Sequence, residues 1–250
     1  MQILLANAKI MINNAKTQPL TEPVFQNVAN MLAADMSQQN VEELAALLGC
    51  NHKIAHENWK RYQNFFTTEP HPAIMSYNGQ AYKHLKASDL NDEELIFAQK
   101  HLWITCFLYG LLRPMDGIVP YRMEHNVRLP STDNVPLTQF WKDKLTDILI
   151  NSVKADDNVL IHLSTEEYEH LFDWQRVRRE TTVIQPLFYV RQKDDTLKMQ
   201  AVWAKACRGA MVRFILHNRI KSPDELSAFS HEGFEYNPNI GETLFPHFVR

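Results

Sequence analysis

Short strand-like runs alternate with longer stretches of helical periodicity along the whole chain. Of all the sequence features, this alternation restricts the possible fold classes most strongly. Apolar residues spaced three and four apart predict helices, and short runs of β-branched or aromatic residues predict strands. The segments expected to be helical are 22–34, 41–48, 54–66, a helix that begins among Asp89–Glu94 and reaches Leu112, 137–150 and 208–220. The expected strands are 2–5, 158–163, 181–190 and 198–205, and the stretch after Phe229 reads as irregular. One α+β domain spanning residues 1–250 follows, with a mixed sheet flanked by helices.

The chain lacks the sequence motifs of nucleotide-binding, disulfide-rich, zinc-ribbon and membrane-spanning proteins. Its 7 glycines form neither a GxGxxG nor a Walker motif, so we expect no cofactor. The three cysteines lie far apart, without a CxxC pair, and predict neither a disulfide framework nor a zinc ribbon. The apolar stretches are too short to cross a bilayer, and Met1 leads directly into a strand-like run. We therefore expect a cytoplasmic protein without membrane contact.

The segment from 47 to 55 is similar to the turn of a helix-hairpin-helix, within an element of about residues 41–62. Such a turn uses glycines so that backbone N–H groups converge on a phosphate. Gly49 fits the first glycine, and Asn51 replaces the second because asparagine tolerates positive φ. Lys53 adds charge beside the turn. The alternative is a plain helix–turn–helix connection capped by Gly49.

Two histidines follow this turn at a spacing that can hold a metal. His52 and His56 lie one helical turn apart, just after Cys50. No third ligand is indicated by the sequence, and such pairs are common on solvated helix faces. We therefore expect no metal here.

A proline-shaped loop gathers charged and aromatic residues into a short stretch. Arginines held by short backbone segments are suited to bidentate contacts with anions, whereas an ion-pair network that braces the loop is the alternative. The candidate residues in this loop are Tyr109, Arg113, Asp116, Tyr121, Arg122 and Glu124.

A basic segment is expected to open the helix that starts at Arg208. Lys205 and Arg208 would then lie at a helix N-terminus, where cations are unfavourable unless an anion is bound. Arg213 follows within the same helix. Cys207 lies between Lys205 and Arg208. If both bases faced this thiol, its pKa would be lowered and it would react with peroxide, although free cysteines are more often inert residues of the core. We expect Arg113, Arg122, Lys205 and Arg208 to converge on one anion-binding cleft.

A further candidate lies where a strand ends and a short helix begins. Ligands of α/β proteins gather at the carboxyl ends of strands, which makes Thr165, Glu167 and Tyr168 candidates. Ser164 or Thr165 also suits a helix N-cap, and Glu167 suits a first-turn acid.

These segments resemble the YaaA family of bacterial peroxide-stress proteins over nearly the whole chain. The N-terminal segment is similar in kind, with Ala8 and Lys9 retained. At other positions the chain departs from the family pattern, for example at His162, Thr165 and Ala206. The most specific matching pieces are Leu108-Tyr109-Gly110, Leu112-Arg113-Pro114 with Asp116, Pro120-Tyr121-Arg122 with Glu124, Gln139-Phe140-Trp141, Leu163, Glu167-Tyr168, Lys205, Arg208-Gly209, Arg213-Phe214, Asn218-Arg219, Phe229 and Glu232-Gly233-Phe234.

The resemblance implies a cytoplasmic protein, induced by hydrogen peroxide, that limits damage from unincorporated iron. It also implies a helix-hairpin-helix element and a positively charged cleft suited to double-stranded DNA, bound without sequence specificity. The net charge of −3 argues against charge-driven DNA binding by the whole surface, but a local basic face is compatible with it. One alternative is an enzyme acting on a small anionic or nucleotide-like substrate in the same cleft, where Lys9 joins the four basic residues in binding the anion and Glu167 or Asp116 handles protons. The other is a metal-handling protein that uses His52, His56 and Cys50.

Overall fold

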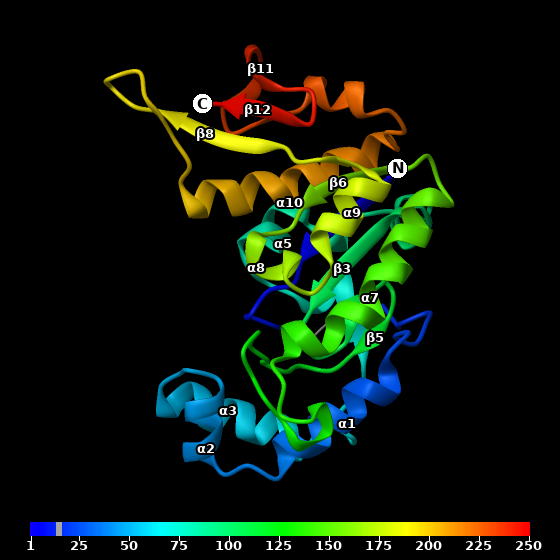
Figure 1. The fold of residues 1–250 in the computed structure, drawn as a ribbon, viewed down its shortest axis with the longest axis vertical. Helices are drawn as coiled ribbons and strands as arrows, with labels where there is room; N and C mark the ends of the chain where they lie inside the picture. Colours follow the sequence, from blue (N-terminus) through cyan, green and yellow to red (C-terminus); the bar gives the residue numbers. More distant parts are fainter. Residues whose placement is uncertain (14–16) are drawn as a thin grey trace.

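The computed structural model describes residues 1–13 and 17–250 and shows an α+β fold, as expected (Figure 1). Mixed sheets are flanked by helices of very different lengths. The α-helices are α1 (Gln26–Ser37), α2 (Val41–Leu47), α3 (His52–Gln63), α4 (Ala73–Ser76), α5 (Gln80–Leu85), α6 (Asp92–His101), α7 (Leu137–Lys154), α8 (Glu166–Glu169), α9 (Trp174–Glu180) and α10 (Ala201–Asn218). Three 3₁₀ helices are η1 (Ala87–Asp89), η2 (Pro130–Thr132) and η3 (Pro223–Ala228).

The central sheet has the strand order β4-β3-β1-β6-β7. Its strands are β1 (Gln2–Ala6), β3 (Leu102–Cys106), β4 (Gly110–Leu112), β6 (Val159–Leu163) and β7 (Thr182–Ile184). All neighbours are parallel except the β3–β4 pair. From β1 the chain first forms β3 on one side and only later β6 on the other. The gap between β1 and β6 is therefore a topological switch point, where open α/β sheets bind ligands.

A second sheet has the order β10-β11-β12-β8-β9 and lies beyond α10, which contacts both β6 and β8 (Figure 1). Its strands are β8 (Leu187–Arg191), β9 (Leu197–Lys198), β10 (Ser230–His231), β11 (Phe234–Glu242) and β12 (Phe245–Val249). The expectation of an irregular C-terminus is wrong. Glu232 and Gly233 both have positive φ, which forms a tight two-residue turn between β10 and β11, and a cluster of buried phenylalanines holds the sheet. A small third sheet pairs β2 (His71–Pro72) with β5 (Gly117–Ile118).

The helix expected to reach Leu112 ends at His101 instead. Residues Leu102–Cys106 form the fully buried strand β3, whose continuous apolar run cannot be told from a buried helix by periodicity. Gly110 then turns the chain into β4 with φ of +71°, and a Cβ there would meet the Trp141 ring at 2.9 Å. Tertiary packing therefore determines that residues 102–112 form two strands and not the end of a helix.

The strand expected over residues 198–205 is also wrong, because α10 already begins at Ala201. Packing of α10 against α5 overrides the alternating pattern. At their contact, Gly209 lies against the backbone of Ala81 with no room for a side chain. Lys205 and Arg208 therefore lie inside a long helix and not at its N-terminus, so the helix-dipole argument for an anion does not hold at these positions.

Candidate ligand-binding pocket

A cavity of about 550 Å³ opens at the carboxyl ends of β1 and β6. Four segments wall this cavity, which we call the switch-point pocket: the residues after β1, helix α5, the residues after β6, and one face of α10. Figure 1 shows α5 and α8 side by side below α10. The pocket lies where the connections from β1 and β6 diverge, so the topology alone creates a space for a ligand.

The cations of the switch-point pocket come from two distant parts of the chain. Lys205 and Arg208 project from α10, and Lys9 follows β1. Within the described residues, Arg208 has neither a hydrogen bond nor an ion pair, although it is partly buried. Burial lowers the pKa of its guanidinium. A desolvated cation without a counter-charge is costly, and a bound anion would remove that cost.

The floor and walls of the pocket are mostly apolar and aromatic. Leu5, Leu163 and Ala81 supply apolar surface, and Tyr82 and Tyr168 add aromatic rings. The pocket can therefore receive the organic part of a ligand as well as its charge.

A chain of hydroxyl and amide groups runs from the pocket into the core. Tyr168 donates a hydrogen bond to the side-chain oxygen of Asn7, whose Nδ2 donates to the Tyr121 hydroxyl at 3.2 Å. The Tyr121 and Tyr77 hydroxyls lie 2.8 Å apart. Burial raises the pKa of Tyr77, Tyr121 and Tyr168 well above the usual value, so all three stay protonated at neutral pH. These groups fix the position of Asn7 at the pocket.

An ion-pair network forms one rim of the pocket. The Lys9 ammonium lies 2.6 Å from Oε2 of Glu124, and an Arg122 guanidinium nitrogen lies 2.8 Å from Oε1. Close by, Nδ1 of His125 lies 3.2 Å from Oε1 of Glu167. Arg122 therefore reaches the pocket only through Glu124, and Glu124 joins the proline-shaped loop to the segment after β1.

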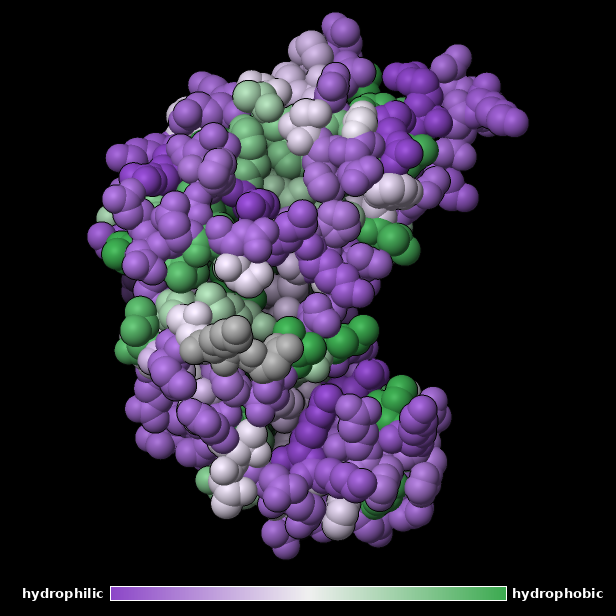
Figure 2. All heavy atoms as spheres, turned by 180° about the vertical axis from the view of Figure 1, so that it is seen from behind, coloured by the Kyte–Doolittle hydropathy of each residue, from purple (hydrophilic) through white to green (hydrophobic). Residues whose placement is uncertain are grey.

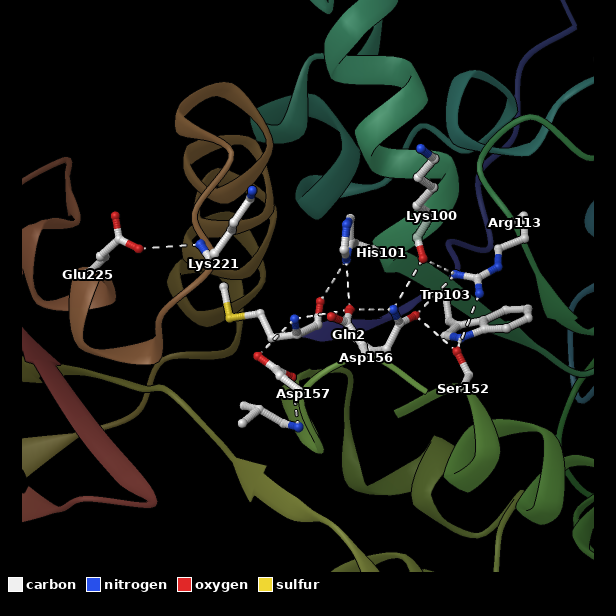
Figure 3. A network of polar contacts seen from close by, with 12 residues as sticks. Gln2, Lys100, His101, Trp103, Arg113, Ser152, Asp156, Asp157, Lys221 and Glu225 are labelled. Carbon is white, nitrogen blue, oxygen red and sulfur yellow. Dashed lines mark hydrogen bonds and ion pairs between the residues drawn. The ribbon is translucent and has the colours of Figure 1, made fainter. Parts of the chain in front are cut away.

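Arg113 does not join the other cations, so the expected convergence of four basic residues is wrong. Its guanidinium lies over the Trp103 ring, 3.3 Å from the centroid. Its Nη1 donates to the carbonyl oxygen of Lys100 and to Oε1 of Gln2, as Figure 3 shows, and also to the carbonyl oxygen of Leu102. Gln2 begins β1, whereas the pocket lies at the other end of that strand. Burial lowers the pKa of Arg113 to about 10.

Asp116 and Tyr109 also lie away from the switch-point pocket. Asp116 accepts hydrogen bonds from the Thr21 hydroxyl at 2.6 Å and from the Arg113 backbone at 2.7 Å, so it braces the loop. The Tyr109 hydroxyl accepts a hydrogen bond from the Val119 backbone, and its ring lines a separate cavity of about 420 Å³.

Arg213 points to a third location. It donates to the carbonyl oxygens of Leu85 and Lys86, which end α5, and lies 3.8 Å from Asp89. It thereby ties α10 to the C-terminus of α5 beside a different cavity of about 450 Å³.

The segment in which a hairpin element was expected forms the two helices α2 and α3, which lie at the far end of the molecule from α10 (Figure 1). Gly49 has φ of +54° and is exposed. The expected positive φ of Asn51 is wrong. Its φ is −73°, and its side chain accepts a hydrogen bond from the Ile54 N–H at 3.0 Å, which makes it the N-cap of α3. Lys53 is exposed.

The two histidines on α3 lie on its exposed side. The His52 and His56 rings stack with centroids 6.4 Å apart, and Nε2 of His52 lies 3.5 Å from Glu42. In the part of the chain that the structure describes, neither they nor Cys50 belong to a cluster of three or more potential metal ligands.

Cys207 is buried inside α10, and the condition for a lowered pKa, that Lys205 and Arg208 face the thiol, is not met. Burial raises the pKa of this thiol to about 12. Lys205 and Arg208 point to the pocket instead, because residues 205 and 207 lie on different sides of a helix.

Asn7 and Tyr82, which line the pocket, and His125, which lies beside the lining residue Glu167, are among the residues of this region that were not expected from the sequence. Asn7 stands where the family pattern differs, Tyr82 belongs to a six-residue helix with a weak pattern, and His125 carries no motif. The only sequence feature that could have indicated one of these three residues is the position of His125 directly after the candidate residue Glu124.

The chain is similar to known proteins over its full length. Residues 1–240 match the model of a family described as peroxide stress protein YaaA. A UPF0246 protein of Bacteroides fragilis is 45% identical over 246 residues, covering 97% of this chain and 95% of that protein. A UPF0246 protein of Phocaeicola vulgatus is 44% identical over 253 residues, covering 100% and 98%. One of Legionella pneumophila is 35% identical over 259 residues, covering 100% and 99%.

The chain therefore belongs to the peroxide stress protein YaaA family, which supports a role in stress protection. Among the residues described, no helix has the length and apolar character needed to cross a membrane.

Proposed function

We propose that this YaaA-family protein acts in peroxide stress by binding a small anionic, nucleotide-like ligand in the switch-point pocket. One observation carries the proposal: the partly buried Arg208 guanidinium lines the pocket without a partner among the described residues. Lys205 and Lys9 add positive charge nearby, and the apolar floor suits the organic part of the ligand. Phosphate or carboxylate would bind the guanidinium through paired hydrogen bonds.

A thermal-shift series with inorganic phosphate, a nucleotide and a short DNA duplex tests this proposal. A ligand at 100 times its Kd adds about 2.7 kcal/mol to the stability of the parent protein, and its melting temperature rises accordingly. Arg208→Ala should remove most of that rise and leave the ligand-free stability unchanged or higher. Arg113→Ala is the matched control, because Arg113 lies at the other end of β1 and its loss should leave the response to ligand intact. A strongly destabilised Arg208→Ala protein with an unchanged response would refute the proposal.

An enzymatic version of this proposal keeps Glu167 as the group that handles protons, since this carboxylate lines the pocket and Asp116 does not. Turnover of a nucleotide by the parent protein but not by Glu167→Gln would support it.

Double-stranded DNA is a second candidate ligand, bound without sequence specificity. Figure 2 shows the surface hollowed between the end formed by α1–α3 and the rest of the molecule, and the α2–α3 turn carries an exposed glycine at positive φ. Binding through several phosphates weakens steeply with salt, whereas binding of one small anion changes much less. Gly49→Val and Lys53→Gln should weaken duplex binding. Undetectable duplex binding at low salt would leave the hairpin as a connection only.

The proposal includes the limiting of damage from unincorporated iron in the cytoplasm, which the family resemblance implies. Cells that lack the protein should accumulate more iron detectable by electron paramagnetic resonance after peroxide treatment. The parent gene should reverse this and the Arg208→Ala gene should not. Cell fractionation tests the location.

A further inference from the structure

Three side chains from two separate segments bring potential metal ligands together at the rim of the switch-point pocket. Glu124 and His125 belong to the loop between β5 and η2, and Glu167 belongs to the first turn of α8. One ligand atom from each lies within 4.8 Å of the other two. Within the described residues this is the one such group of three or more.

The core beneath these residues fixes their positions. The Phe107 ring stacks on Tyr168, with centroids 4.7 Å apart, and also lies 6.2 Å from the His125 ring. Tyr168 follows Glu167 directly, so this packing holds the α8 turn against the loop that carries Glu124 and His125. Aromatic packing therefore holds together the two backbone segments that carry the cluster.

The donor set has a definite chemical preference. Two carboxylates and one imidazole suit Mn²⁺, Fe²⁺ or Zn²⁺, whereas Mg²⁺ and Ca²⁺ prefer oxygen ligands alone. Glu124 is buried, but His125 and Glu167 keep about half and about a third of their side-chain surface exposed. An ion could therefore enter from the pocket side and keep open positions for water or for a ligand anion.

Lys9 is the competitor for this position. Its ammonium lies 2.6 Å from Oε2 of Glu124, and its side chain is 48% exposed. It follows the end of β1 on a surface segment and can turn into solvent at small cost. A divalent ion would bring twice the charge to the same carboxylate.

We infer that Glu124, His125 and Glu167 form a binding site for a divalent transition-metal ion, in which the metal and the Lys9 ammonium compete for Glu124. This inference does not depend on which ligand the pocket binds.

The test uses the full chain, freed of metals, and titrates it with Mn²⁺ under electron paramagnetic resonance and with Zn²⁺ in a calorimeter. One ion should bind per chain. Glu167→Gln and His125→Gln should each weaken binding by at least about tenfold, since loss even of an outer partner of a metal ligand costs that much. Lys9→Met should tighten binding, because it removes the competing cation.

His52→Gln is the matched control, since His52 also lies beside an exposed glutamate, Glu42, but has no third ligand. This variant should bind metal like the parent. Absence of stoichiometric binding by the parent, equal losses in His52→Gln and His125→Gln, or weaker binding by Lys9→Met would each overturn the inference.

The outcomes separate this inference from the proposed anion site. Lys9→Met should strengthen metal binding and weaken binding of phosphate, and His125→Gln, at a residue that does not line the pocket, should weaken metal binding without weakening phosphate binding. If the metal-binding results contradict the inferred metal site, the proposed anion site is unaffected, and the reverse also holds.

Discussion

The backbone of Gly209 in α10 lies so close to Ala81 in α5 that a Cβ at position 209 would sit 1.8 Å from the Ala81 carbonyl oxygen. This contact sets the distance between two walls of the switch-point pocket, because Ala81 lines the pocket and Arg208 precedes Gly209. The smallest side chain at position 209 would push the two helices apart.

Gly209→Ala should therefore destabilise the protein by about 1–3 kcal/mol or more, as overpacking does, and weaken ligand binding in the pocket. Urea unfolding and the phosphate thermal shift measure the two effects. Gly49→Ala is the control: position 49 has open space and only a left-handed φ, so it should cost about 1 kcal/mol and leave the pocket unchanged. Equal effects of both variants on ligand binding would contradict this account of the α5–α10 contact.

Arg113→Ala should destabilise the fold by at least about 2 kcal/mol. The variant loses hydrogen bonds from a charged donor and leaves the carbonyl oxygens of Lys100 and Leu102 with fewer partners. Arg113→Lys should recover only part of the loss, since an ammonium lacks the planar fork that lies over Trp103. Urea unfolding measures both variants, and a neutral Arg113→Ala would show that the network in Figure 3 is not stabilising.

Cys106 and Cys207 should resist both peroxide and thiol reagents in the folded protein. Burial raises their pKa values to about 11 and about 12, so the thiolate is scarce at neutral pH and the sulfur atoms are covered. A chromogenic disulfide reagent should therefore titrate at most Cys50 in the native state and all three thiols in urea. Rapid native reaction that persists in Cys50→Ser would revive Cys207 as a redox group.

Low pH should remove the contribution that the ionised Glu94 side chain makes to the free energy of unfolding. Its carboxylate accepts a hydrogen bond from the Asn91 backbone at 2.8 Å and also faces His217, and these contacts lower its pKa from the usual range of a glutamate. A depressed carboxyl pKa stabilises the fold fully above the unfolded-state pKa and loses that effect as the pH falls through the folded-state value.

Urea unfolding of the parent and of Glu94→Gln from pH 7 to pH 3 tests this. The difference in unfolding free energy should shrink as the pH falls through the lowered pKa of Glu94. A difference that grows toward low pH would mean that the pKa of Glu94 is raised.

The sequence predicted the helices and strands in which the periodicity of apolar residues matches the face that is buried in the structure. Strand β1, helices α1–α3, α7 and strand β6 appear close to the expected positions, and so do the two segments, after β1 and after β6, that end at the pocket. Lys9, Thr165, Glu167, Tyr168, Lys205 and Arg208 were expected at a ligand site, and all line one cavity.

Tertiary structure decided which side chains face that cavity. Pro114 restricts the backbone beside Arg113 but leaves the guanidinium free to reach Trp103, a partner that the antiparallel pairing of β3 and β4 brings near. The secondary structure of residues 102–106 was likewise settled by burial between layers, where an apolar run satisfies a strand and a helix equally well. Local sequence specifies backbone preference over a few residues. The direction and partners of a charged side chain depend on contacts between segments more than a hundred residues apart, such as Lys9 with Glu124, and these exist only in the folded chain.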